Sequence, residues 1–551
     1  MDKSSIDQQN IERQEDLISF ESYFHIKKSY LLWIVIVFAA FLRLYNFSGE
    51  SLWTDEIGTC WISGAPSLAE TARRTVVTQG QSPFYYVLEH LVVSVLPAKE
   101  WSLRLLSLIA ALVSVVLIFK MSYLIFEDNI KALTAALVFA INENLIYYGR
   151  EARPYSLGLM LALLSMIYFI RITQRNTRKD ALIYTVSTIA MCYCHYVFAS
   201  ILIAQNIYLA YQIFYRKNPI RGKVSYWIST QIVTGISLLL LFGQIEGMFY
   251  NRSNWNWLTI LPLNQAIMQF AGIFNPITLV ILIACFLIFV FIQQNENLLS
   301  NIISGKQDQI VLLGLWLIVP FVFICVISYL LHISLFDTRY LVICLLPFSI
   351  ILGDLLCVFK TSVLRIAFPG AYVLIYLGLV LIPDCIRTGT FSKRVGHDWK
   401  NAVEYINNNY EQGDVVLLRL GEIKENWIAQ PENMPVQDYK IVCEYARSPF
   451  EIFYWKGPKK IPVFSLTYSW NEDFYPYYDL IFEKLSGYKR IWLIGVNPPN
   501  TNYPISNISR LLTREFYWTR HKNMNFSGVS VDLLGSEYIP AKNRKLKEIG
   551  N

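Results

Sequence analysis

A series of apolar runs, each long enough to cross a membrane, constrains the fold of this chain more than any other feature. A helix rises about 1.5 Å per residue, so about 20 apolar residues cross the ~30 Å hydrocarbon core of a bilayer. We therefore expect an α-helical polytopic membrane protein with about eleven transmembrane helices. The runs lie near residues 30–47, 101–119, 131–147, 154–171, 181–196, 197–214, 225–243, 275–293, 310–331, 340–358 and 362–383.

The composition agrees with a membrane protein. Hydrophobic residues make up 54% of the 551 residues and charged residues only 16%, which is unlike a soluble protein. The net charge of +7 is spread over short loops, so it indicates membrane topology and no nucleic-acid partner. Residues 1–29 are polar and charged, which predicts a cytoplasmic tail ahead of a retained first span.

The basic residues predict the orientation in the membrane. Lys and Arg gather in alternate loops, and the side that collects them is normally cytoplasmic. The loops that carry the conspicuous polar clusters then face the outside, as does the chain after the last span. The basic residues of the alternate loops are Lys120, Lys131, Arg171, Arg175, Arg178, Lys179, Arg216, Lys217, Arg221, Lys223, Lys306, Lys360 and Arg365.

Two stretches between the first two spans are predicted to lie on the outer surface. The stretch after Trp53, up to Val77, has the pattern of an amphipathic helix lying on the membrane. The apolar stretch 83–96 is too short to cross and carries Glu89 and His90, so we interpret it as a second surface helix. If it did cross, the two main acidic clusters would lie on opposite sides of the membrane.

The chain becomes polar after the last span. A helix-like segment begins at His397, with Asp398 as its expected cap, and strand-like runs begin at Val415 and Lys489. We expect three parts: a tail (1–29), a transmembrane domain (30–383) and a small extracytoplasmic α/β domain (384–551).

Four segments of the outer face resemble a known family in order and spacing. They are the pair Asp55-Glu56, the segment 81–90, the segment 101–108 and, most specific, the segment 147–157 (Tyr-Tyr-Gly-Arg-Glu-Ala-Arg-Pro-Tyr-Ser-Leu). Together they resemble the lipid-phospho-sugar-dependent glycosyltransferases of the GT-C class, especially the bacterial branch akin to protein O-mannosyltransferases and aminoarabinose transferases. The resemblance covers roughly residues 30–390 and is weakest in the outer domain.

This resemblance implies a reaction. The donor is a sugar on an undecaprenyl-type or dolichyl-type phosphate, and transfer inverts the anomeric carbon on the extracytoplasmic side. The acceptor can be a glycan, a lipid or a protein, and a divalent metal ion is left open as a cofactor. The setting is a multi-pass protein among membrane lipids, in a bacterial inner membrane or, with the same topology, in the endoplasmic reticulum.

Three acidic residues match positions of the family's site. Asp55 matches the catalytic acid, which acts as general base on the acceptor hydroxyl; a solvated loop carboxylate is the alternative. Glu56 would support Asp55 or contact the acceptor. Glu151 would share the acceptor or a metal ion with Asp55, and an ion pair with Arg150 or Arg153 is equally compatible.

Three arginines occupy positions where the donor phosphate is expected. Arg104, Arg153 and Arg339 present guanidinium forks, which suit a phosphate leaving group whose charge grows as the sugar departs. Arginines that place their charge at the membrane surface are the alternative, above all for Arg104.

Three further residues are candidates for contacts with substrate or metal. His195 resembles one member of a His-Tyr pair common in this branch and is costly at membrane depth, although a packing histidine stays open. Tyr155 belongs to the most specific segment. Gln81 and Ser82 stand where family members carry lysine, which leaves the identity of the donor open.

Two other functions compete with glycosyl transfer. A transporter or a flippase of lipid-linked sugars also has many spans with intramembrane charges. Against it, the polar residues gather at one face of the membrane and not at its midplane. A non-catalytic assembly subunit would have lost Asp55, Glu151 and Arg153.

Overall fold

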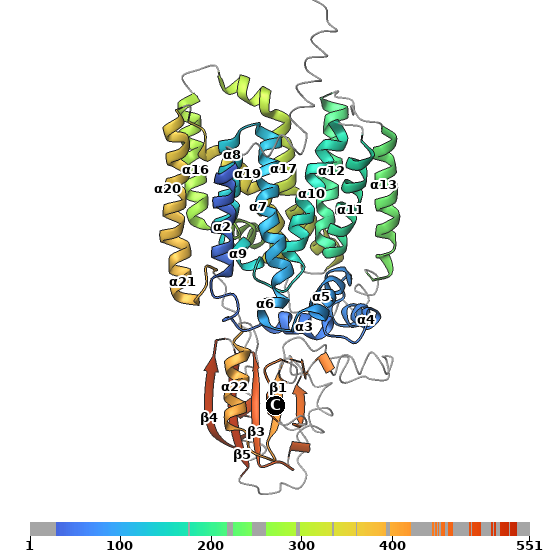
Figure 1. Ribbon diagram of the computed structural model, residues 1–551, viewed down its shortest axis with the longest axis vertical. Helices are drawn as coiled ribbons and strands as arrows, with labels where there is room; N and C mark the ends of the chain where they lie inside the picture. The colour runs from blue at the N-terminus through green and yellow to red at the C-terminus, as the bar shows by residue number, and fades with distance from the viewer. Residues whose placement is uncertain are drawn as a thin grey trace, which may run out of the picture.

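The protein has a bundle of helices at one end and a β-sheet domain at the other (Figure 1). The computed structural model describes residues 29–174, 177–216, 224–244, 260–293, 298–332, 335–359, 361–392, 397–419, 444–445, 447–448, 450, 453–457, 461–466, 484–485, 487–496, 508–510, 512–513, 518–527 and 529–536. The predicted tail, 1–29, lies outside the described residues except for Ser29.

The bundle is built from long apolar helices that pack on one another. The long helices are α2 (Ser29–Leu44), α7 (Leu105–Phe126), α8 (Asn129–Ile141), α10 (Tyr155–Gln174), α11 (Arg178–Cys194), α12 (Ala199–Ala210), α13 (Val224–Leu239), α15 (Leu263–Gly272), α16 (Pro276–Gln293), α17 (Leu298–Leu331), α19 (Leu345–Leu356) and α20 (Ser362–Tyr376). The short elements are α6 (Glu100–Leu103), α9 (Glu143–Tyr148), η2 (Tyr196–Phe198), η3 (Tyr211–Tyr215), α18 (Thr338–Leu341), η5 (Val342–Cys344), η6 (Leu377–Leu381) and α21 (Ile382–Thr388).

The polytopic class predicted from the sequence is confirmed, with fewer candidate spans. Seven helical segments of the described chain are long and apolar enough to cross a membrane, and an eighth is the pair α15–α16, which bends by 84°. The other three predicted runs, 30–47, 131–147 and 181–196, fall on helices of 16, 13 and 17 residues. These helices are shorter than the average crossing of about 20 residues, and α2 begins at the first described residue.

Small residues allow the central helices to approach closely. At Gly353 of α19, an added Cβ would lie 2.7 Å from the backbone nitrogen of Ala135 in α8. Close contact of this kind is how helices associate in a bilayer, where apolar side chains gain little by leaving lipid. The buried centre of the bundle is therefore packed by α7, α8, α10 and α19.

Three surface helices lie across one end of the bundle, between it and the sheet domain (Figure 1). They are α3 (Thr54–Ser63), α4 (Leu68–Gln79) and α5 (Phe84–Val95). The prediction that 83–96 forms a second surface helix agrees with α5, which has only 12 residues. The stretch up to Val77 was expected as one helix and forms two, because Pro66 lies in the break and the Ser67 side chain caps α4.

In its described residues, the C-terminal domain contains a mixed sheet and a helix of 11 residues. α22 (Trp399–Asn409) precedes β1 (Val415–Arg419), β2 (Val463–Leu466), β3 (Arg490–Val496), β4 (Trp518–Phe526) and β5 (Val529–Ser536). The strand order is β2-β1-β3-β5-β4, with β1 parallel to β2 and β3, and β5 antiparallel to its neighbours. The predicted α/β character is confirmed, and Asp398 caps α22 by accepting from the Asn401 N–H at 3.2 Å.

The start of α22 lies against the start of α3. The Trp399 indole donates to Thr54 Oγ1 at 3.2 Å, and the Lys400 N–H donates to Ser51 Oγ at 3.1 Å. The Leu52 N–H donates to the Tyr454 hydroxyl at 2.8 Å. The C-terminal domain therefore contacts the residue next to Asp55.

Candidate functional site

Glu56 anchors the loop before α3 to the start of α7. Its carboxylate binds the Arg104 guanidinium through two hydrogen bonds, from Nε at 2.9 Å and from Nη2 at 2.7 Å. It also accepts from the N–H of Ala152 at 2.8 Å and of Trp53 at 3.3 Å, which caps α3. Both side chains are almost fully buried, at 1% and 2% exposure. Glu56 has no need of a ligand to satisfy its charge.

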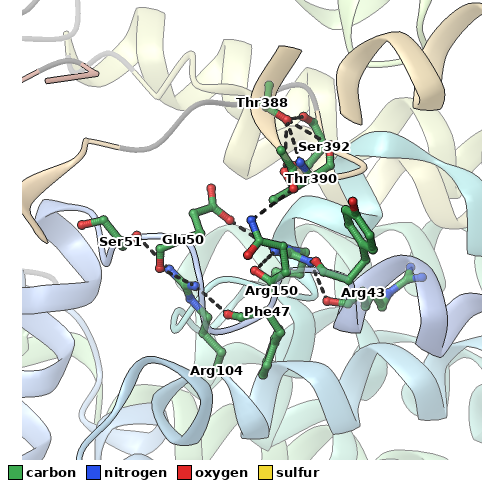
Figure 2. A network of polar contacts seen from close by, with 12 residues as sticks. Arg43, Phe47, Glu50, Ser51, Arg104, Arg150, Thr388, Thr390 and Ser392 are labelled. Atoms are coloured by element: carbon green, nitrogen blue, oxygen red, sulfur yellow. Dashed lines mark hydrogen bonds and ion pairs between the residues drawn. The ribbon is translucent and has the colours of Figure 1, made fainter. Parts of the chain in front are cut away.

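Arg104 uses its remaining donors on the backbone of the same loop (Figure 2). Nη1 donates to the carbonyls of Phe47 and Glu50, and Nη2 donates to the carbonyl of Ser51, at 3.0–3.2 Å. With the bonds to Glu56, these contacts account for the five N–H donors of a guanidinium. A phosphate would have to displace one of these partners to reach Arg104.

A second arginine holds the end of α2 in the same way (Figure 2). Arg150 donates to the carbonyls of Arg43 and Asn46 and lies 3.4 Å from the Glu50 carboxylate. A positive charge at the last carbonyls of a helix is favourable because it complements the helix dipole. Arg150 and Arg104 therefore fix the loop between α2 and α3, the helix that carries Asp55.

Asp55 lies between two other arginines. Its Oδ2 atom is 3.3 Å from Arg339 Nη1 and 3.7 Å from Arg153 Nη2. Asp55 is 7% exposed and comes from the first turn of α3, whereas Arg153 precedes α10 and Arg339 belongs to α18. Arg339 Nε is also 3.0 Å from the Asp337 carboxylate. Three of the predicted site residues, far apart in sequence, therefore meet at one carboxylate oxygen.

The surface helices position Arg153. Its Nη1 donates to the Tyr86 hydroxyl of α5 at 2.9 Å and to Gln79 Oε1 of α4 at 3.1 Å. Burial raises the pKa of Tyr86, so its hydroxyl keeps its proton. Gln79 and Tyr86 were not among the predicted site residues. Gln79 lies two positions from Gln81, and Tyr86 belongs to the segment 81–90. Only the fold shows that both contact Arg153.

An aromatic group lies beside these arginines. The ring of His195 is 4.9 Å from that of Tyr340 and 5.9 Å from that of Tyr155. Burial, with Arg153 and Arg339 nearby, lowers the pKa of His195 to about 3. Its Nδ1 accepts from the Val197 N–H at 3.4 Å, which leaves the proton on Nε2. His195 is therefore a neutral group at physiological pH.

Glu151 lies on a cleft next to the Asp55 site. The cleft is small and is lined by Glu50, Ser51, Trp53, Glu56, Arg104, Tyr147, Arg150 and Glu151. The Tyr147 hydroxyl donates to Glu151 Oε1 at 3.4 Å.

Gln81 is buried, and its amide oxygen has no hydrogen-bond partner among the described residues.

The acidic residues do not gather as a metal site. In the described part of the chain, no three His, Cys, Asp or Glu side chains are grouped closely enough to hold a metal ion. The nearest charged groups of Asp55 are arginines, which is a poor environment for a cation. The side chains around Asp55 therefore do not fit a divalent metal ion.

Comparison with known proteins finds a family profile that matches part of the chain and solved structures with a similar fold. Residues 80–242 match the sequence profile of the family described as dolichyl-phosphate-mannose-protein mannosyltransferase. ArnT from Cupriavidus metallidurans, bound to undecaprenyl phosphate, superposes with a TM-score of 0.52 and 9% identity over 92% of this chain and 98% of that chain. Its apo state gives 0.50 and 9% over 94% and 98%. No curated protein sequence matches the chain significantly.

A third solved structure is similar at a lower score. The archaeal oligosaccharyltransferase AglB from Archaeoglobus fulgidus, in complex with an inhibitory peptide and a dolichol-phosphate, gives a TM-score of 0.44 and 13% identity. The similarity covers 95% of this chain and 75% of that chain. The ArnT comparisons are the ones that establish the fold.

Proposed function

We propose that the chain is a membrane glycosyltransferase of the GT-C class, which transfers a sugar from a polyprenyl phosphate to an extracytoplasmic acceptor with inversion. The undecaprenyl phosphate bound by ArnT and the dolichyl-phosphate donor in the matched family's description support this class of donor. The acceptor is a glycan, a lipid or a protein.

The proposal rests on the ion pairs of Asp55 with Arg153 and Arg339. Two guanidinium groups at one carboxylate form a site that a phosphate can enter by taking over their N–H donors. Donor binding then frees Asp55 to accept a proton. The arginines that hold Asp55 therefore become the donor site.

The proposed reaction is a single displacement. The acceptor hydroxyl oxygen attacks the anomeric carbon, the bond from that carbon to the phosphate oxygen breaks, and Asp55 takes the hydroxyl proton. The electron pair of the broken bond stays on the polyprenyl phosphate, whose growing charge is stabilised by Arg153 and Arg339. The products are the glycosylated acceptor and free polyprenyl phosphate.

The other predicted site residues receive different roles. We assign Glu56 and Arg104 to holding the first loop, because their charges and donors are already satisfied by each other and by the backbone. Glu151, on the adjacent cleft, is assigned to the acceptor. Tyr155 and the neutral His195 are assigned to the sugar or to the packing of Arg339. Gln81 remains a candidate for the donor head group.

We place the Asp55 end of the bundle outside the cytoplasm, in a bacterial inner membrane. The ion pairs Arg171–Asp180 and Lys131–Asp354 involve basic residues of the alternate loops, which are expected on the cytoplasmic side. The basic residues Arg175, Lys217, Arg221, Lys223 and Lys360 lie outside the described residues. We assign residues 30–383 to the catalytic membrane domain and residues 384–551 to the outer domain.

Replacing Arg339 with glutamine tests the phosphate assignment. We expect Arg339→Gln to lower kcat/KM for a polyprenyl-phospho-sugar between about 10- and 100-fold, because one charge-assisted contact to the leaving phosphate is lost. Arg339→Lys keeps the charge but not the fork, so it should recover part of the loss. The measurement is release of polyprenyl phosphate from radiolabelled donor by purified protein in detergent. Wild-type kcat/KM in Arg339→Gln would remove this residue from the donor site.

A further inference from the structure

A residue of the C-terminal domain reaches the helices that hold the active-site arginine. Tyr445 lies on α3 and α4, where its hydroxyl oxygen accepts from Gln79 Nε2 at 3.1 Å. Its ring centroid is 5.5 Å from that of Trp61. Its ring also packs over Gly58, where an added Cβ would lie 2.9 Å from Tyr445 Cε2.

The neighbouring residue gives this segment a second point of attachment. The Glu444 carboxylate lies 3.8 Å from Arg74 Nη2. Arg74 is itself held on α4 and α3: its Nη1 donates to the Trp61 carbonyl at 2.8 Å, and its guanidinium lies 4.2 Å from the Trp61 ring centroid. The segment 444–445 is therefore fixed by both charge and ring packing.

Gln79 connects Tyr445 with the Asp55 site. While its amide nitrogen donates to Tyr445, its amide oxygen accepts from Arg153 Nη1 at 3.1 Å. Arg153 Nη2 in turn lies 3.7 Å from Asp55 Oδ2. A continuous series of polar contacts thus runs from the C-terminal domain to the proposed base.

The hydrogen-bond donors and acceptors on either side of Gln79 determine how its amide group is oriented. A guanidinium has donors only, so the Gln79 oxygen must face Arg153 and the Gln79 amino group must face Tyr445. The Tyr445 hydroxyl supplies the acceptor that this orientation needs. Without it, the amino group loses its acceptor, and the amide is freer to turn its oxygen away from Arg153.

We propose that Tyr445 is a positioning residue for glycosyl transfer, which acts through Gln79 to orient the Arg153 guanidinium at Asp55. This inference rests on the proposed function, since it concerns the same reaction. It gives the C-terminal domain a part in catalysis: the domain supplies a side chain that sets the geometry of the site.

The first test removes one oxygen atom. In the full-length protein, Tyr445→Phe keeps the ring on Gly58 and Trp61 but removes the acceptor for Gln79. We expect kcat to fall about fivefold, the usual effect of losing one neutral hydrogen bond, with the donor KM within about twofold of wild type. Arg153 is then misplaced for the transition state, where the phosphate charge is largest.

The matched control is Tyr405→Phe. Tyr405 belongs to α22 of the same domain, and its ring packs on Trp492 and Phe526. This variant should keep the wild-type kcat and melting temperature. Tyr445→Phe should also keep the wild-type melting temperature, which separates positioning from loss of fold.

Two further variants test the route through Gln79. Gly58→Ala should displace the Tyr445 ring and lower kcat while the hydroxyl is still present. Gln79→Leu should lower kcat, and Tyr445→Phe should lower it no further in the Gln79→Leu background. A wild-type kcat in Tyr445→Phe would overturn this inference but not the proposed function. So would a double variant in which the effects of Gln79→Leu and Tyr445→Phe on kcat multiply. A wild-type protein that consumes no polyprenyl-phospho-sugar would overturn the proposed function and this inference together.

Discussion

Asp55→Asn is expected to lower kcat between about 10²- and 10⁴-fold, the range for loss of a general base. Asparagine has nearly the same size and keeps an oxygen for Arg153 and Arg339, but it does not accept the proton of the acceptor hydroxyl. Binding of the donor should therefore persist. The measurement is release of polyprenyl phosphate from radiolabelled donor, beside equilibrium binding of the same donor.

Asp337→Asn is the matched control for this prediction. Asp337 also contacts Arg339, at 3.0 Å, so its replacement removes a neighbouring negative charge without removing the proposed base. We expect it to change kcat less than about tenfold, since only a supporting contact of Arg339 is altered. Equal turnover by Asp55→Asn and wild type would exclude Asp55 as the base.

Arg104→Met is expected to destabilise the protein by about 3–5 kcal/mol, because it leaves the Glu56 carboxylate buried without its main partner. The double variant Arg104→Met/Glu56→Met should be closer to wild type, since no uncompensated charge is then left in the interior. The measurement is thermal or denaturant unfolding of the protein in detergent. A large effect would agree with the assignment of this pair to holding the loop.

A more exposed ion pair provides the control. Lys400 Nζ lies 3.3 Å from Glu100 Oε1, and the lysine side chain is 39% exposed. Lys400→Met should cost less than about 1 kcal/mol, because solvent screens such a pair. If Arg104→Met unfolded like wild type but lost donor binding, Arg104 would belong to the donor site as its sequence position indicates.

Much of the fold follows from apolar patterning. Run length locates the membrane helices, and the polar sequence after residue 383 predicts a separate α/β part. Run length alone does not show that the described parts of α2, α8 and α11 have only 16, 13 and 17 residues. Nor does it show the 84° bend between α15 and α16, which depends on tertiary packing.

Only part of the candidate site can be predicted from the sequence. The motifs selected Asp55, Arg153 and Arg339, which the fold brings together. The same reasoning predicts Arg104 at the phosphate, and the sequence does not reveal that backbone carbonyls of Phe47, Glu50 and Ser51 accept from its N–H donors. Tyr445 belongs to the C-terminal domain, where the family resemblance is weakest. Its contact with Gln79 spans 366 positions and has no local signal.

The most direct test of the account is turnover of polyprenyl-phospho-sugars by the purified wild-type protein, screened over several sugars with cell-envelope glycans, lipids and proteins as acceptors. We expect one donor to be consumed, with free polyprenyl phosphate released and the sugar joined to an acceptor in the inverted anomeric configuration, as determined by NMR. Movement of intact lipid-linked sugar across a reconstituted bilayer, without cleavage of any donor, would contradict glycosyl transfer and favour a flippase.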